Sequence, residues 1–188
     1  MTESKTGGEH GATHLCSGSS GTRSASVRRL TAAADAPYTG VPTDIYWMEM
    51  AIKEALRAGE DVPVGCVIVK DGKVLSSGHN EKENSQDPTD HAEIIAIRKA
   101  SIILKSWRLE NTTIYTTLEP CPMCAEAIMQ TRISRLVFGA YDIQSGAVGS
   151  KFNLFIPGRP YPVPQVTGGV LQEQCQDLLV NFFRQRRK

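Results

Sequence analysis

The sequence of 188 residues has no apolar run close to the roughly 18–20 residues that a membrane-spanning helix needs. We therefore expect no membrane span and no membrane partner. Its formal net charge is only +1, so net charge alone indicates neither a nucleic-acid partner nor an acidic one. The N-terminus lacks the apolar core of a signal peptide, and the five cysteines are an odd number. A disulfide framework is thus not expected, and a reducing compartment fits these thiols better.

Large apolar side chains are almost absent from the first 40 residues, which are rich in Gly, Ser, Thr and Ala. Such a segment buries too little apolar surface to offset the entropy that is lost when a chain becomes ordered. We expect residues 1–40 to be a disordered extension and residues 41–188 to form one domain. No internal repeat and no second core is visible in the rest of the chain.

Helical and strand patterns alternate from residue 44 onward. Apolar residues spaced by three and four predict a helix over 44–60, and Asp71-Gly72 predicts a tight hairpin between strands 63–69 and 73–80. The other predicted elements are helices within 87–104, 122–133 and from 171, and strands over 112–119, 135–142 and, more weakly, 163–170. This order predicts an α/β fold in which helices cover a sheet.

Two separated stretches, "DHAE" and "PCPMC", contain the residue types of a zinc site. Cys121 and Cys124 are three residues apart, so both thiols share one face of a helix, near its positive end. His91 falls in the first turn of another predicted helix. The sequence therefore predicts one zinc ion bound by His91, Cys121 and Cys124, with the fourth position open to water.

Glu93 is not one of the three zinc ligands in this arrangement. A carboxylate beside the metal but not bound to it is free to carry protons, so we expect Glu93 to be the catalytic residue. The pattern H-x-E…P-C-x-x-C is the recorded signature of zinc nucleobase deaminases. A C-x-x-C pair by itself also occurs in structural zinc sites and redox pairs. A structural zinc site needs a fourth protein ligand, and a redox pair does not account for His91 and Glu93.

The C-terminal residues 184–188, "RQRRK", contain four positive charges and no negative one. Either they form a solvated tail or they contact phosphate groups.

From about residue 43 to its end, the chain resembles the bacterial tRNA-specific adenosine deaminases. The resemblance rests on the stretches "DVPVGCVIV", "GHN", "DPTDHAEIIAIRKA", "TTLEPCPMCAEAI", "RLVFGAYD" and "FFRQRR". It implies a cytidine deaminase-like three-layer α/β/α sandwich with a mixed five-stranded sheet, one zinc ion per subunit, a homodimer and a cytoplasmic location. It also implies hydrolytic deamination of adenosine to inosine at the wobble position of tRNA, chiefly an arginine tRNA with anticodon ACG.

The resemblance further implies that the substrate-binding residues are Asn80 and Val64 at the flipped base, Asp142 at a ribose, and Phe182 or Phe183 at splayed anticodon bases. The basic C-terminal residues would then contact phosphates. The chain departs from the family after Asp142, where many relatives have a lysine within two residues and this chain has Ile143 and Gln144.

Two alternatives share the predicted zinc residues. One is a deaminase of small nucleobases such as guanine, which would give the basic, phenylalanine-containing C-terminus nothing to bind. The other is a non-catalytic RNA-binding module that keeps zinc for structure. Glu93 argues against that module, because a structural zinc site has no use for an unbound carboxylate.

Overall fold

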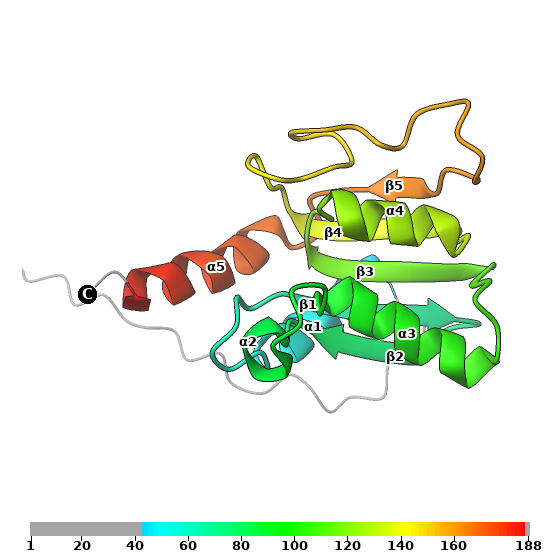
Figure 1. Ribbon diagram of the computed structural model, residues 1–188. Helices are drawn as coiled ribbons and strands as arrows, with labels where there is room; N and C mark the ends of the chain where they lie inside the picture. The colour runs from blue at the N-terminus through cyan, green and yellow to red at the C-terminus, as the bar shows by residue number, and fades with distance from the viewer. Residues whose placement is uncertain (1–42, 187–188) are drawn as a thin grey trace, which may run out of the picture. The chain divides into compact units, whose positions relative to one another are not determined.

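The computed structural model describes residues 43–186, which fold around one mixed sheet (Figure 1). The expected disordered extension, residues 1–40, lies outside this range. The strands are β1 (Gly65–Lys70), β2 (Lys73–His79), β3 (Thr112–Leu118), β4 (Arg135–Ala140) and β5 (Gln165–Thr167). The helices are α1 (Asp44–Ala55), α2 (Lys82–Ser85), α3 (Ala92–Leu104), α4 (Pro122–Gln130) and α5 (Gln172–Arg186).

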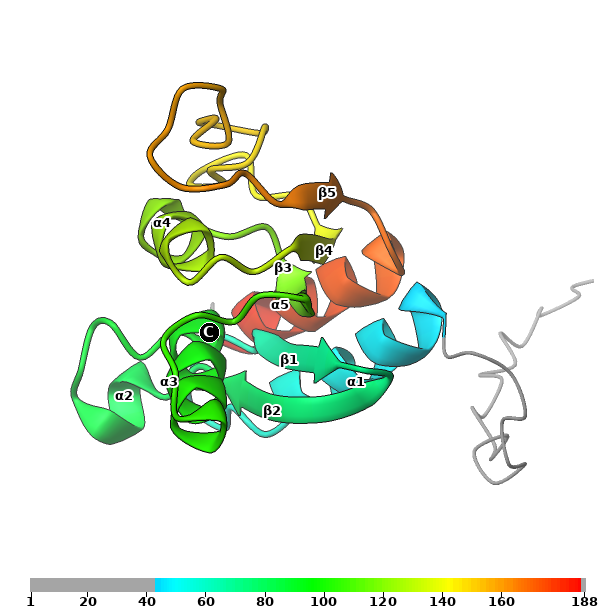
Figure 2. The same cartoon turned by 90° about the vertical axis from the view of Figure 1, so that its right-hand side faces the viewer.

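The strands lie in the order β2-β1-β3-β4-β5, antiparallel from β2 to β3 and parallel from β3 to β5. Helices α3 and α4 cover one face of the sheet, and α1 and α5 cover the other, as Figure 2 shows. The predicted three-layer sandwich with a mixed five-stranded sheet is therefore confirmed.

Residues of β1 alternate between the two apolar cores. Cys66 and Ile68 pack toward α3 and α4, whereas Val67 and Val69 pack toward α1. The strand is buried on both faces because helices cover both, so it reads as a continuous apolar run. Each such valine or isoleucine contributes about 1.5–3 kcal/mol when fully buried.

Two glycines let helices approach this strand pair closely. A Cβ atom at Gly65 would lie 2.1 Å from the carbonyl oxygen of Ala51 in α1. A Cβ at Gly78, on the opposite face, would lie 2.6 Å from the carbonyl oxygen of Ala92 in α3. Real Cβ atoms do not come so close to a backbone, so the distance between helix and sheet at both points depends on the missing side chain.

The predicted hairpin is present. Asp71 and Gly72 join β1 to β2 with φ angles of +50° and +69°, the backbone of a type I′ turn. Several predicted boundaries were wrong. Helix α1 ends at Ala55, five residues before the predicted end at residue 60. Gly59, inside the predicted helix, has φ +61°, which is not a helical conformation. Strand β5 has three residues, and Pro164, which has no N–H for the ladder, directly precedes it. The short helix α2 was not predicted.

An ion pair fastens the start of α1 to the sheet. Asp44 accepts two hydrogen bonds from the guanidinium of Arg135 in β4, both with N···O distances of 2.7 Å. It also accepts one from the hydroxyl of Tyr115 in β3, at 3.0 Å. The paired geometry matches the planar guanidinium to the carboxylate, the stronger form of such contacts.

Within residues 43–186, no helix combines the length and the apolar character that crossing a bilayer would require.

Candidate active site

The starts of α3 and α4 bring the predicted zinc ligands together. His91 is the N-cap residue of α3 and Cys121 is the N-cap residue of α4, both with extended backbone. Pro122 occupies the first turn of α4, where its missing N–H costs nothing, and Cys124 follows in the same turn. Two helix N-termini, each with a positive end, thus meet at one point.

The geometry of these three side chains fits zinc. The Nδ1 atom of His91 lies 3.7 Å from the Sγ atoms of both Cys121 and Cys124. All three ligand atoms lie within 4.8 Å of one another. Tetrahedral zinc, with Zn–S near 2.3 Å and Zn–N near 2.0 Å, requires about 3.5 Å between nitrogen and sulfur. Two thiols and one imidazole are also the ligand types that zinc prefers.

Protonation in the cluster favours a negatively charged sulfur. Hydrogen bonds from Cys124 and then from His91 lower the pKa of Cys121 to about 4, although burial opposes this. A hydrogen bond to Cys121 also raises the pKa of His91, and a separate hydrogen bond to Cys121, followed by burial, raises the pKa of Cys124. These shifts favour a thiolate at Cys121, the form in which a cysteine binds zinc.

Glu93 lies beside this cluster and is only 3% exposed. Burial raises the pKa of its carboxyl to about 7. It lines the same cavity as the cluster but is not one of the three grouped ligands. A buried carboxyl that titrates near neutral pH can both accept and donate a proton, which suits a proton carrier.

The cavity above the cluster, called here the central cavity, has a volume of about 220 Å³. That volume is smaller than the roughly 300–1,000 Å³ typical of sites for drug-sized ligands, so it suits a single base. Its lining residues are Val62, Val64, Asn80, Lys82, His91, Glu93, Leu118, Glu119, Cys121, Asp142 and Ser145. The expected base contacts Asn80 and Val64 are thus both at the cavity, and Val64 supplies an apolar wall.

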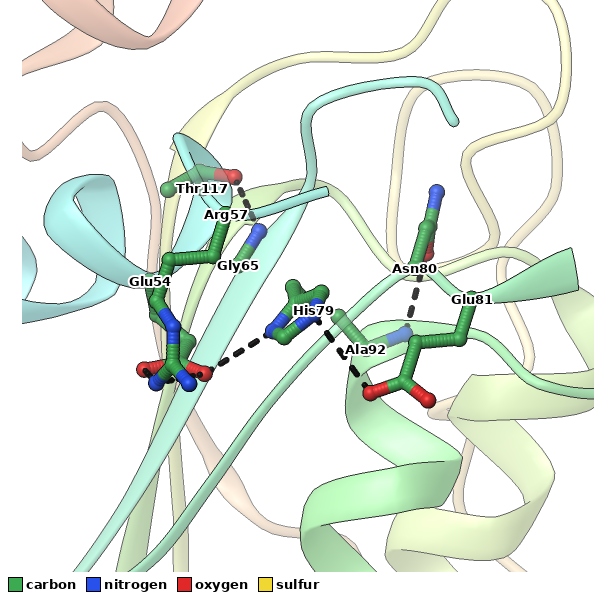
Figure 3. A network of polar contacts seen from close by, with 8 residues as sticks. All are labelled: Glu54, Arg57, Gly65, His79, Asn80, Glu81, Ala92 and Thr117. Carbon is green, nitrogen blue, oxygen red and sulfur yellow. Dashed lines mark hydrogen bonds and ion pairs between the residues drawn. The ribbon is translucent and has the colours of Figure 1, made fainter. Parts of the chain in front are cut away.

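Asn80 is buried and makes two hydrogen bonds within the protein. Its Nδ2 atom donates to the carbonyl oxygen of Val62, and its Oδ1 atom accepts from the backbone amide of Ala92, both at 3.0 Å. Figure 3 shows the second of these bonds. A side-chain amide has two N–H groups and two lone pairs, so one of each remains for a ligand.

His79 precedes Asn80 but is not part of the cluster; it belongs to a network with α1. Its Nδ1 atom lies 2.9 Å from the carboxylate of Glu54, and its Nε2 atom lies 3.4 Å from that of Glu81 (Figure 3). Glu54 also pairs with Arg57 at 3.1 Å. This second histidine is therefore no fourth ligand for the metal.

Asp142 and Phe183 border a second hollow next to the central cavity, the flanking pocket. It has a volume of about 450 Å³ and is lined by Val62, Leu118, Tyr141, Asp142, Ile143, Gln144, Ser145, Leu179 and Phe183. The carboxylate of Asp142 accepts hydrogen bonds from the amides of Gln144, at 2.9 Å, and Ser145, at 3.1 Å, so it caps its own turn.

Phe182 is not among the residues that line the flanking pocket. Its ring packs edge-to-face on Phe183, with the ring centres 5.3 Å apart, and under the guanidinium of Arg186, 4.3 Å from its carbon. The structure therefore places only Phe183 of the two phenylalanines at the candidate site. Arg187 and Lys188, part of the basic C-terminus, lie outside the described residues.

Two lining residues, Lys82 and Glu119, were missed from the sequence. Lys82 is the only lysine or arginine that lines the central cavity, and residues 43–186 contain no ion pair that uses it. It belongs to α2, the helix that was not predicted. Glu119 lies two residues before Cys121, but its contacts are with a distant part of the chain.

Comparison with known proteins identifies the family to which this chain belongs. A family model described as the cytidine and deoxycytidylate deaminase zinc-binding region matches residues 41–140, a range that includes the whole cluster and Glu93. The chain belongs to this deaminase family. The expected zinc cofactor is confirmed by that match together with the grouped ligands.

The deaminase is 44% identical, over 147 residues, to the tRNA-specific adenosine deaminase of Bacillus subtilis, in an alignment that covers 77% of this chain and 91% of the relative. A solved structure from work on A-to-I editing by tRNA:A34 deaminases superposes with a TM-score of 0.68 at 41% identity, covering 71% of this chain and 99% of that one. The guanine deaminase of Bacillus subtilis has 33% identity and a TM-score of 0.50, covering 76% and 92%. The resemblance to the tRNA-specific adenosine deaminases is thereby confirmed.

Proposed function

We propose that this deaminase converts adenosine to inosine by hydrolysis at the wobble position of tRNA, chiefly an arginine tRNA with anticodon ACG. The central observation is a zinc-type ligand cluster with a buried, unligated Glu93 at the base of a cavity the size of one base. The 44% identity to a tRNA-specific adenosine deaminase supports the choice of substrate. The same residues in a deaminase of free guanine would leave the flanking pocket and Phe183 without a role.

We propose His91, Cys121 and Cys124 as the ligands of one zinc ion per subunit. When bound, zinc supplies water acidic enough to give hydroxide near neutral pH. Glu93 accepts one proton of the attacking water and delivers it to the ring nitrogen N1 of adenine, where it stays in the product. It then carries the second proton, from the hydroxyl now on C6, to the departing amine. The C6–N6 bond breaks, a C6–O bond forms, and ammonia leaves. Burial suits Glu93 to both transfers, because it raises the pKa of the carboxyl to about 7, near neutral pH.

The base is held by the free half of the Asn80 amide and by the apolar side chain of Val64. A base inside a stacked loop cannot reach a buried cavity, so the nucleotide must be turned out of the stack. The flanking pocket then receives a neighbouring base against Phe183, while Asp142 lies within reach of the ribose between the two. Phe182 acts indirectly, by packing on Phe183.

Phosphate groups arrive with an RNA loop but not with a free base. Lys82 at the central cavity and Arg184 in α5 are the cations that we assign to them, and Arg187 and Lys188 extend the basic segment. Lys82 thus offers its positive charge at the central cavity, whereas Ile143 and Gln144 line the flanking pocket without a charge.

We further propose a homodimer that acts in the cytoplasm. The C-terminal end of α3 exposes apolar side chains, with Ile102 75%, Ile103 57% and the nearby Trp107 50% exposed. An apolar surface of this kind commonly packs against a second chain. The cytoplasm keeps thiols reduced and therefore available as metal ligands.

The test uses the purified protein and an anticodon stem-loop of arginine tRNA with adenosine at the wobble position. The product is sequenced for inosine, and the Glu93→Gln protein and free guanine are assayed beside it. We expect conversion of the RNA by the parent protein only. Turnover of guanine with the RNA untouched would instead support the small-molecule deaminase, and conversion by Glu93→Gln would remove Glu93 from the mechanism.

A further inference from the structure

Glu119 is a buried carboxylate in the turn that joins β3 to α4, two residues before Cys121. It is only 2% exposed, and residues 43–186 contain no ion pair that neutralises it. Burying a charge without a counter-charge is costly unless hydrogen bonds replace its water. The location of those hydrogen bonds therefore indicates what Glu119 does.

All the side-chain hydrogen bonds of Glu119 come from one loop, residues 142–150. Its Oε2 atom accepts from the amide of Asp142 at 3.1 Å. Its Oε1 atom accepts from the amides of Val148, at 3.1 Å, and Ser150, at 3.0 Å. The hydroxyl of Ser150 donates to Oε2 as well. The carboxylate thus accepts hydrogen bonds from three backbone amides and one hydroxyl of the loop, none of which is paired within a helix or strand.

The backbone of the same loop closes tightly around the carboxylate. A Cβ atom at Gly146 would lie 2.5 Å from Oε2 of Glu119 and 2.5 Å from the carbonyl oxygen of Asp142. The amide of Ala147 donates to the carbonyl oxygen of Pro120 at 2.8 Å, which ties the loop to the residue just before Cys121. Only glycine fits at position 146 while the loop remains in contact with Glu119.

This loop forms one wall of both hollows at the site. Asp142 and Ser145 line the central cavity, and residues 142–145 line the flanking pocket. On its other side, Glu119 leads through Pro120 to the ligand Cys121. Glu119 therefore connects the chain that presents Cys121 to the wall that a nucleotide must contact.

We propose that Glu119 is a positioning residue that holds the 142–150 loop as the substrate-binding wall, at a fixed distance from the metal cluster. The proposal rests on the proposed function for its substrate, but not for the hydrogen bonds that it assigns. Glu119 lines the central cavity, but both of its carboxylate oxygens are bonded to the loop, so we assign it no contact with the reacting atoms. Its loss lets the wall move, which weakens binding of the RNA while Glu93 and the metal ligands stay in place.

The first variant is Glu119→Gln, with Glu110→Gln as its matched control. The glutamine side chain keeps the shape of glutamate, but its NH2 group replaces one oxygen and so faces backbone N–H donors of the loop that it cannot accept from. Glu110 is an exposed glutamate whose carboxylate pairs only with Arg132. We expect KM for the anticodon stem-loop to rise about 10-fold in Glu119→Gln, with kcat changed less than about 3-fold, because one buried hydrogen-bond set is lost. Zinc per chain and the kinetics of Glu110→Gln remain those of the parent.

A second measurement does not depend on the substrate. Hydrogen exchange of the amides of Asp142, Val148 and Ser150 is expected to accelerate in Glu119→Gln, while the amides of α3 keep their protection. If the parent protein fails to convert the stem-loop, the proposed function falls, and hydrogen exchange still decides whether Glu119 holds the loop.

A milder variant, Ser150→Ala, removes one hydroxyl donor and leaves the carboxylate intact. If Glu119→Gln does not fold, a rise in KM of about 2-fold or more in Ser150→Ala with unchanged kcat supports the proposal, as expected for one lost hydrogen bond. Unchanged KM in a folded Glu119→Gln or, failing that, in Ser150→Ala overturns it. So does loss of zinc or a fall in kcat alone, which would make Glu119 a support of the metal or of the chemical step.

Discussion

The Oδ1 atom of Asn80 accepts a hydrogen bond from the amide of Ala92 at 3.0 Å, so the end of β2 is tied to the residue that follows His91. The same side chain donates to the carbonyl oxygen of Val62 on its other side. One amide thus spans from the loop before β1 to the start of α3. The residue expected to bind the base also fixes the helix that presents His91 and Glu93.

Replacement of Asn80 by alanine should therefore lower stability as well as activity. The change removes the partner of the buried amide of Ala92, which costs about 1–3 kcal/mol, whereas the carbonyl oxygen of Val62 still accepts from the amide of Val64. Urea denaturation measures the loss in the free energy of unfolding. Asn84→Ala, at an exposed asparagine of α2, should change it by less than about 0.5 kcal/mol. Equal stability of Asn80→Ala and the parent would contradict the bridging role.

Glu93→Gln should abolish most turnover while the metal stays bound. The amide cannot carry a proton, and general acid–base catalysis contributes about 10²–10⁴-fold in rate. Single-turnover conversion of the stem-loop measures the rate, and atomic absorption measures zinc per chain. Glu173→Gln, in the exposed first turn of α5, serves as the control. Loss of zinc together with activity would mean that Glu93 supports the metal site.

Cys124→Ser should lose zinc, whereas Cys175→Ser should retain it. Both thiols are buried, but only Cys124 belongs to the cluster, and Cys175 packs between α5 and β4. The comparison therefore separates loss of a ligand from loss of packing. Zinc per chain after gel filtration without added metal decides between them. Retention of zinc by Cys124→Ser would remove that sulfur from the ligand set.

Lys82→Gln should weaken the dependence of RNA binding on salt. A lysine that contacts one phosphate releases about one counterion, so its loss should reduce the slope of log Kd against log salt by about 1. The slope is measured by titrating a labelled stem-loop from low to moderate salt. Lys70→Gln is the matched control, because its ammonium donates to the carbonyl oxygen of Glu110 at the far end of β1. Identical slopes for Lys82→Gln and the parent would exclude the phosphate contact.

Asp44→Asn should destabilise the fold at neutral pH but not in acid. The hydrogen bonds from Arg135 hold the pKa of Asp44 below its ordinary value of 3.8. Because the folded pKa is the lower one, this stabilisation is present above about pH 4 and disappears as pH falls through the folded value. We expect a loss of about 1–2 kcal/mol at pH 7, since the pair is partly exposed.

The measurement is urea denaturation of Asp44→Asn and the parent at pH 7 and at pH 3. The difference between them should shrink at the lower pH. Asp177→Asn, on the exposed side of α5, should show no such change. If the difference in the free energy of unfolding were the same at both pH values, the charge of the Asp44 carboxylate would not be its cause.

Local patterns were enough to predict most of the fold and the metal cluster. The Asp71-Gly72 turn and the proline in the first turn of α4 are each encoded within a few residues. His91, predicted within the first turn of its helix, is instead the N-cap residue of α3. The convergence of His91 on Cys121 follows because each begins a helix on the same face of the sheet. The separation of 1–40 from the domain stays a prediction.

The roles of Lys82, Glu119 and Phe182 depend on contacts between segments that are far apart in the chain. The partners of Glu119 lie 23–31 residues away, in a loop without periodicity, so nothing in "LEPC" indicates them. Helix α2 has four residues, too few for an apolar repeat, and its Lys82 reads as an ordinary surface lysine. Phe182 and Phe183 are neighbours in sequence, and only packing decides which one borders the flanking pocket.

The two glycines of the β1–β2 pair limit where this protein can change. Because Gly65 and Gly78 let α1 and α3 rest almost directly on the strands, a side chain at either point would push a helix outward. At Gly78 that helix is α3, which begins at His91. The floor of the site therefore tolerates little divergence. A new substrate preference, whether evolved or engineered, is expected to arise at the rim, through changes in α2, the 142–150 loop and the last turns of α5.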